Sequence, residues 1–211
     1  MKLFYGIVVL SVLLSCSSAR MTDSWKSDDY ANYQPKKVLI VGITDNLTAR
    51  KIFEQSLKEK LLKRNVFAVE SSLVFEKDFM DSRQTQEQID KEVNRFVAEG
   101  FDAVLISAVK GVDNQTSYSG KQFSSGYYWH HFGRYYYLYQ DVYFEPGYYN
   151  SYKVYHIEAS LYNIKTNNDK SLVWVSSYDI VDPVSISTTV NDYARAIVKS
   201  LEKASIIVPQ K

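Results

Sequence analysis

The spacing of apolar and polar residues predicts how the first part of the folded domain is built. The continuous apolar run Val38–Ile43 is typical of a strand buried in the middle of a sheet. Thr44–Asn46 follow and offer caps for a helix, and apolar residues then recur at spacings of three and four up to about Arg64. The pattern therefore predicts a strand that leads directly into an amphipathic helix.

The same alternation continues through the next 50 or so residues of the chain. A short apolar strand is expected at Val66–Val69, and a second amphipathic helix at Glu87–Glu99. Gly100 stands where a helix commonly ends, and Asp102–Val109 reads as a third buried strand. The order β-α-β-α-β predicts parallel strands joined by right-handed crossovers, with helices packed on the sheet.

After Lys110 the composition changes. Residues 111–151 hold most of the 18 tyrosines of the chain, together with several glycines. Tyr152–Ile164 and Leu172–Ile180 then predict a β-hairpin around a polar turn, and Ser187–Ser205 predicts a terminal amphipathic helix. The expected fold class is therefore α/β: β-α-β-α-β, a β-hairpin and a C-terminal helix, in one mixed sheet with helices packed on it and a Tyr-rich insertion at about 111–151.

The amino terminus has the pattern of a targeting segment. The apolar run Leu3–Leu14 is shorter than the roughly 20 residues that span a bilayer, and it fits the apolar part of a signal peptide. The run ends in Leu13-Leu14-Ser15-Cys16, which resembles the lipobox of bacterial lipoproteins and implies cleavage before Cys16 and acylation of its sulfur. An ordinary secretory signal and a single membrane anchor are the alternatives.

These features predict three parts: a signal peptide at residues 1–15, a lipidated flexible tether at 16–35 and a single α/β domain at 36–208. Trp25, Tyr30 and Tyr33 lie in the tether, where a linker with a few aromatic residues is favoured over docking on the domain. Aspartate directly after the cysteine would resemble an inner-membrane retention signal. Ser17 and Ser18 occupy these positions, which favours an anchor in the outer membrane, facing the periplasm.

Composition excludes several classes of function. The formal net charge of +1 gives no reason to expect capture of nucleic acid. The single cysteine rules out an internal disulfide or a Cys-x-x-Cys metal site. The sequence lacks a G-x-S-x-G elbow and a phosphate-binding G-x-x-x-x-G-K-[ST] loop. We therefore expect a protein that is not an enzyme and carries no cofactor, with an enzyme of unrecognised type left open.

Histidines give no better case for metal chemistry. His130 and His131 are adjacent, and neighbouring residues of a strand point to opposite faces. Asp141 and Glu145 lie near them in sequence, but no spacing matches a zinc motif. Solvated or loop-packed histidines, His156 among them, are the preferred interpretation, and no metal site is predicted.

The Tyr-rich segment is the candidate binding element. Its aromatic rings could supply a large contact area and hydroxyl groups at low entropic cost, as at protein interfaces, and they could also stack on sugars. The alternative is a Tyr-rich hairpin or loop that packs only on itself. The residues predicted to bind a partner are Tyr127, Tyr128, Trp129, Tyr135, Tyr136, Tyr137 and Tyr139.

Several of these elements resemble a group of bacterial envelope proteins. The strand Val38–Ile43 leads into a long helix, the strand Asp102–Ile106 follows a helix that ends at Gly100, and Leu161-Tyr162-Asn163 precedes a polar turn and Leu172-Val173-Trp174. This arrangement is similar to the TolB amino-terminal domain, the curli-export lipoprotein CsgG, LpoB and uncharacterised lipoproteins with Tyr/Gly-rich loops. Asn163 departs from the aspartate common in these hairpins.

The resemblance implies action through contact with other proteins or self-assembly, without catalysis. The function expected from sequence is therefore a non-enzymatic cell-envelope lipoprotein that binds a protein partner or assembles with itself at the membrane. A module that binds glycan, namely peptidoglycan, through the Tyr-rich loop is the alternative.

Overall fold

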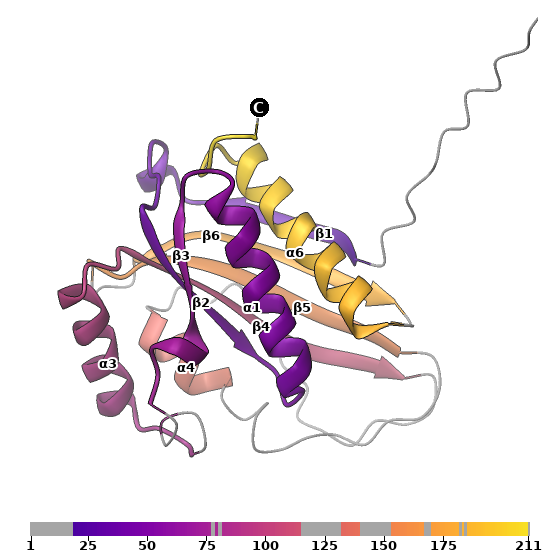
Figure 1. The fold of residues 1–211 in the computed structure, drawn as a ribbon, viewed down its shortest axis with the longest axis horizontal. Helices are drawn as coiled ribbons and strands as arrows, with labels where there is room; N and C mark the ends of the chain where they lie inside the picture. The colour runs from indigo at the N-terminus through magenta and orange to yellow at the C-terminus, as the bar shows by residue number, and fades with distance from the viewer. Residues whose placement is uncertain are drawn as a thin grey trace, which may run out of the picture.

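The computed structural model describes residues 19–76, 79, 82–114, 132–139, 153–166, 170–181, 183 and 185–210. Six strands form one mixed sheet in the order β1-β6-β5-β4-β2-β3 (Figure 1). The strands are β1 (Ala19–Lys26), β2 (Lys37–Ile43), β3 (Phe67–Glu70), β4 (Ala103–Asn114), β5 (Lys153–Asn163) and β6 (Leu172–Val181). The packed helices are α1 (Leu47–Leu62), α3 (Gln86–Ala98), α4 (Phe132–Tyr139) and α6 (Ile186–Lys203), and the short turns η1 (Asp28–Tyr30) and η2 (Ser71–Leu73) follow β1 and β3.

The predicted β-α-β-α-β unit is confirmed. β2 pairs in parallel with β3 on one side and with β4 on the other. Asn46 caps α1 by accepting a hydrogen bond from the backbone N–H of Ala49 at 2.9 Å. Gly100 ends α3 with a φ of +86°, a conformation that glycine adopts at little cost.

The carboxyl-terminal half also follows the prediction. β5 and β6 form the antiparallel hairpin, and β5 pairs antiparallel with β4, which joins the hairpin to the parallel strands. The terminal helix α6 begins after Ser185, whose hydroxyl caps it. The result is one mixed sheet with helices packed on it.

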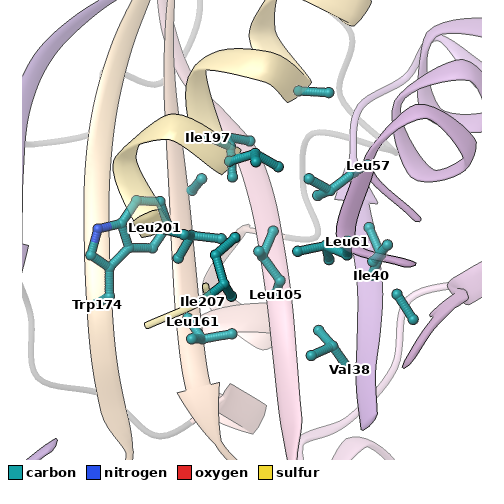
Figure 2. Packing of buried hydrophobic residues seen from close by; sticks show 14 of the residues in the cluster. Val38, Ile40, Leu57, Leu61, Leu105, Leu161, Trp174, Ile197, Leu201 and Ile207 are labelled. Atoms are coloured by element: carbon teal, nitrogen blue, oxygen red, sulfur yellow. The ribbon is translucent and has the colours of Figure 1, made fainter. Parts of the chain in front are cut away.

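Two hydrophobic cores form because both faces of the sheet are covered. α1 and α6 lie on one face, where Leu57, Leu61, Ile197 and Leu201 meet strand residues such as Leu105 (Figure 2). α3 and α4 cover part of the other face, and their buried residues join Leu39, Val41 and Ile106 from the strands. Trp174 is 0% exposed and belongs to the first core, as expected for a core residue.

The expected flexible tether is wrong for the residues from Ala19 onward. Ala19–Lys26 form β1, which pairs antiparallel with β6 from Ala19 opposite Ile180 to Lys26 opposite Trp174. The aromatic residues that follow are docked on the domain. The Tyr33 hydroxyl donates to the carbonyl of Asp102 at 3.0 Å, and the Tyr30 hydroxyl pairs with that of Thr166 at 3.2 Å.

β1 escapes the pattern analysis for a physical reason. It is an edge strand, so its stability comes from backbone hydrogen bonds to β6 more than from buried side chains. Arg20–Ser24 are all exposed, and the register shifts between Met21 and Asp23, which interrupts an alternating pattern. A polar strand of this kind resembles a linker in sequence.

Candidate functional site

The candidate binding residues fall into three groups. Cys16, Tyr127, Tyr128 and Trp129 lie outside the described residues, so their predicted roles stay predictions. Tyr135 and Tyr139 belong to α4, but their side chains are not among those described. Tyr136 and Tyr137 are described in full, and they differ in exposure, because Tyr136 is buried and Tyr137 is exposed.

Tyr136 is a core residue, which corrects its assignment to a partner-binding surface. It is 2% exposed, and its ring lies 6.1 Å from Phe75 and from Phe132 and 6.0 Å from Phe79, measured between centroids. Phe132 and Tyr136 are spaced four residues apart, so they share the face of α4 that packs on the domain. Burial raises the pKa of the Tyr136 hydroxyl well above its ordinary value.

Tyr137 remains available to solvent. It is 41% exposed, and the guanidinium carbon of Arg134 lies 5.7 Å from the centre of its ring, within range of a cation–π contact. Both residues lie on the part of α4 that faces away from the core. Tyr137 is therefore the predicted binding residue that the described structure leaves accessible.

Gly133 lets α4 approach α3 closely. A Cβ atom at this position would lie 2.4 Å from Asp90 Oδ1 and 2.8 Å from Gln86 Nε2. These two side chains are themselves joined by a hydrogen bond of 3.0 Å along α3. A side chain at this position would therefore have to push aside the ends of these two side chains.

Four strand ends meet at one end of the sheet, which we call the Ala19 end. β1 begins there at Ala19, β6 ends there, β5 begins there at Lys153 and β4 ends there at Asn114 (Figure 1). The chain between Asn114 and Lys153, which contains the Tyr-rich segment and α4, therefore leaves the sheet and returns to it at the Ala19 end.

A row of charged residues crosses the strands near this end. Arg20 stands opposite Asp179, and Asp179 stands opposite His156. His156 Nδ1 lies 2.7 Å from Asp179 Oδ1, and its Nε2 lies 3.1 Å from Asp113 Oδ2. Ionised carboxylates only accept hydrogen bonds, so this geometry favours an imidazolium ring that donates from both nitrogens.

The protonation of His156 follows from its surroundings. Partial burial by itself lowers the pKa of the imidazole, but hydrogen bonds and charges from Asp113 and Asp179 outweigh burial, so the pKa is raised overall. Both ring nitrogens are engaged, and the side chain is 40% exposed. This arrangement is a poor general base, because the free lone pair that a base needs is absent when both nitrogens donate.

A buried carboxylate lies at the carboxyl end of β2. Glu54 of α1 is 0% exposed, and its Oε1 accepts from the backbone N–H of Gly42 at 3.0 Å and from the Ser71 hydroxyl at 2.6 Å. Burial raises the pKa of this carboxyl, and the hydrogen bonds from Ser71 and Gly42 and the charge of Arg50 offset only part of the rise. Glu54 ties α1 to β2 and to the segment after β3.

Sequence analysis missed Glu54, although a signal was present. The residue lies on the buried stripe of α1, one position after Phe53 and three before Leu57. A charged residue on that stripe requires a partner. The group of Asp113, His156 and Asp179 had no such signal, because it depends on the register between three strands.

Apolar side chains are exposed in two places relevant to binding. The first is the edge of the sheet at β3, where Phe67 is 55% exposed and Leu73, just beyond the strand, is 67% exposed. The second is formed by residues near the starts of α1 and α6 and the end of β6: Leu47 is 64%, Ile186 43% and Val181 39% exposed. Exposed apolar groups of this kind occur where a protein contacts another surface.

Metal-binding clusters and membrane-spanning helices are both lacking among the described residues. These residues contain no group of three or more His, Cys, Asp or Glu side chains suited to hold a metal ion. None of the helices in this part of the chain has the length and apolar character needed to cross a bilayer. The fold defines the class as a mixed α/β domain, with exposed apolar residues at the β3 edge and near the starts of α1 and α6.

Comparison of the sequence with protein families and with curated proteins finds no match. Solved structures similar to the chain include two PelC dodecamers from Paraburkholderia phytofirmans, both at 10% identity and covering 87% of this chain. One covers 97% of the PelC chain with a TM-score of 0.43, and the other covers 95% with a TM-score of 0.44. Lipoprotein GNA1162 from Neisseria meningitidis is similar at 16% identity, over 80% of this chain and 99% of its own, with a TM-score of 0.39.

Likenesses at these identities and TM-scores define neither a family nor an activity. The third neighbour is by name a bacterial lipoprotein. The resemblance to the TolB, CsgG and LpoB group stays a prediction from sequence.

Proposed function

We propose that this chain is a lipid-anchored protein of the bacterial cell envelope that acts by binding another protein or by self-assembly, without catalysis. The observation that carries the proposal is the motif Leu13-Leu14-Ser15-Cys16 at the end of a signal-peptide apolar run, with the only cysteine of the chain at its last position. A diacylated or triacylated cysteine holds a protein at a membrane almost permanently, because each buried methylene contributes about 0.8 kcal/mol. Ser17 and Ser18 favour the outer membrane, with the domain in the periplasm.

The described surface supports binding over catalysis. His156 has both ring nitrogens engaged by carboxylates, and Glu54 is fully buried and held by two donors. Neither geometry offers an accessible base beside a nucleophile. Phe67 and Leu73, in contrast, expose apolar area at an open strand edge, and Tyr137 exposes an aromatic ring on α4.

The anchor is tested by replacing Cys16 with serine in cells fed labelled palmitate. We expect the native chain to take up label and to sediment with outer membranes, and Cys16→Ser to remain unlabelled and unprocessed or to be released. A Cys16→Ser variant that is processed normally and still fractionates with membranes would refute the lipoprotein assignment.

The partner surface is tested by in-cell cross-linking and purification. Phe67→Ser with Leu73→Ser removes the apolar edge, Tyr137→Ser removes the exposed ring, and Leu62→Ser is a control with 43% exposure elsewhere on α1. We expect a cross-linked protein, or a second copy of the chain, to be lost with one test variant and kept with the control. Retention on isolated peptidoglycan with no cross-linked protein would instead favour the glycan-binding function.

A further inference from the structure

The folded domain begins unusually close to the proposed lipid anchor. Only Ser17 and Ser18 separate Cys16 from Ala19, and Ala19 is 7% exposed and already paired with Ile180 of β6. Three residues span at most roughly 11 Å even when fully extended. A domain of this size has a radius of gyration of roughly 16 Å. The anchor therefore cannot let the domain turn freely, and the Ala19 end must remain near the lipid.

Helices as well as strands start at the Ala19 end. The Ser56 hydroxyl pairs with the Asn191 side chain at 2.6 Å, and Arg64 pairs with Glu202 at 2.5 Å. Successive contacts in the same direction show that α1 and α6 run parallel. α6 begins beside the end of β6 (Figure 1), and α1, which runs parallel to α6, begins on the same side of the sheet.

The register of β2 places the start of α1 toward the same end, because Ile43 at the end of β2 stands opposite Ala108 of β4, and β4 continues from there to Asn114 at the Ala19 end. Tyr155 of β5 stands opposite Ile180 of β6, which in turn stands opposite Ala19. Burial raises the pKa of the Tyr155 hydroxyl, and the nearby charge of Asp45, just before α1, raises it further. Because β2 runs parallel to β4, Asp45 and Leu47, which follow β2, lie on the side of the Ala19 end.

This end presents apolar side chains to its surroundings. Leu47, Ile186 and Val181 are exposed there, as described above. Among the residues that the structure describes, the charges in the same region are mixed: Arg20, Lys153 and the His156 ring, paired with two carboxylates, are balanced by acidic residues, namely Asp45, Asp113 and Asp179. Apolar contact, rather than attraction between opposite charges, is thus the chemistry that this end offers to a surface.

We propose that the Ala19 end, with Leu47, Val181 and Ile186, rests on the headgroup region of the bilayer that holds the Cys16 acyl chains, so that the β3 edge and the carboxyl ends of α1 and α6 point away from the membrane. This inference rests on the proposed lipoprotein function. It adds a fixed orientation, and it names a lipid surface as the occupant of the Ala19 end. The mixed charge also predicts that the contact is insensitive to the fraction of anionic lipid.

The test uses the full-length lipidated protein in phosphatidylcholine vesicles that contain nitroxide-labelled lipid. Acylation consumes the only native thiol, so one introduced cysteine can be labelled alone with a fluorophore. Ile186→Cys is the test position and Leu62→Cys is the matched control, because both residues are 43% exposed and lie at opposite ends of the parallel helices. Leu47→Cys is a second test position in case the first variant misfolds.

We expect lipid nitroxides to quench the probe at residue 186 or 47 several-fold more strongly than the probe at residue 62, with the same ratio in vesicles of anionic lipid. Equal quenching at both ends, or stronger quenching at residue 62, would overturn the orientation. Mass spectrometry of the amino terminus separates the two proposals. Acylated, vesicle-bound protein with equal quenching refutes only the orientation, whereas unacylated protein that does not bind vesicles refutes the lipoprotein function itself.

Discussion

Glu54 allows the strongest test of the energetics of this fold. Its carboxyl is fully buried and accepts hydrogen bonds from Gly42 and Ser71, so the side chain links three segments. Glu54→Ala removes the acceptor for both donors, whereas Glu54→Gln keeps one oxygen that can accept from both. The two variants therefore separate the hydrogen-bonding role of the side chain from the cost of its charge.

The burial of the Glu54 carboxyl determines how large both effects on stability should be. A buried hydrogen-bonding group that loses its partner costs about 1–3 kcal/mol, so Glu54→Ala is expected to lower the free energy of unfolding by about 2–5 kcal/mol. Burial raises the pKa of the Glu54 carboxyl above its ordinary value of 4.5. A raised pKa means that the folded state holds the proton more tightly. This stabilisation is complete below pH 4.5 and is lost as pH rises through the pKa of the folded state.

Glutamine does not titrate, so Glu54→Gln should avoid this loss. We expect the two proteins to differ little in acid. The stability of the native protein relative to Glu54→Gln should then fall as pH rises, by at most about 1.4 kcal/mol per pH unit within the window.

Urea unfolding at several pH values measures both effects. Tryptophan fluorescence is suited to it, because Trp174 lies in the first core and Trp25 packs against the second. The free energies of unfolding of the native protein and of Glu54→Gln could instead change in parallel from about pH 4 to about pH 8. That result would show that the carboxyl titrates normally, and it would refute the role of burial. Equal destabilisation by glutamine and alanine would refute the role assigned to the hydrogen bonds.

Two further predictions concern His156 and Gly133. The raised pKa of His156 predicts stability that is full below the ordinary value of 6.5 and is lost as pH rises through the folded-state pKa. His156→Asn should flatten this part of the stability profile in the same urea assay, and an unchanged profile would contradict it. Gly133→Ala must displace the side-chain ends of Asp90 and Gln86 and break the hydrogen bond between them, but alanine is favoured over glycine in a helix by about 1 kcal/mol, so we expect the free energy of unfolding to change by no more than about 1 kcal/mol in the same urea assay. A loss well above that, with no such loss in Gly111→Ala, where a Cβ meets nothing within 4 Å, would contradict the expectation that the two side chains can move.

The parallel half of the sheet could be predicted because local and tertiary signals agree there. Residues 38–43 of β2 are buried on both faces, so the apolar run in the sequence has no competing interpretation. The ends of α1 and α3 were predictable for a related reason, since caps at Asn46 and Gly100 act within a few residues of the helix.

In the Tyr-rich segment, the pattern of apolar and polar residues does not predict which side chains are buried. Runs of tyrosine give no contrast between buried and exposed positions, because the side chain suits both. The structure divides two neighbours: Tyr136 enters the second core and Tyr137 faces solvent. The helical spacing from Phe132 to Tyr136 explains this difference, and the helix α4 was not predicted, because only a hairpin or a loop was considered for this segment.

β1 was predicted as part of a flexible tether, and its place in the sheet changes the functional interpretation. Its attachment does not depend on backbone pairing alone. Ser176 donates to the carbonyl of Asp23 at 2.7 Å, and Lys26 donates to the carbonyl of Ala204, beyond the end of α6, at 2.8 Å. A cation near a helix carboxyl terminus is favourable, so Lys26 holds the far end of β1 to α6.

The consequence concerns orientation. In a chain with a 20-residue tether, roughly 25 Å of random-coil reach would leave every surface free to face the membrane. In this fold the chain enters the sheet at Ala19, and strand pairing fixes which end of the domain lies nearest Cys16. The β3 edge is separated from β1 by four intervening strands. The β3 edge, which we propose as a partner surface, is therefore separated from the proposed anchor by the topology of the sheet and not by the length of a linker.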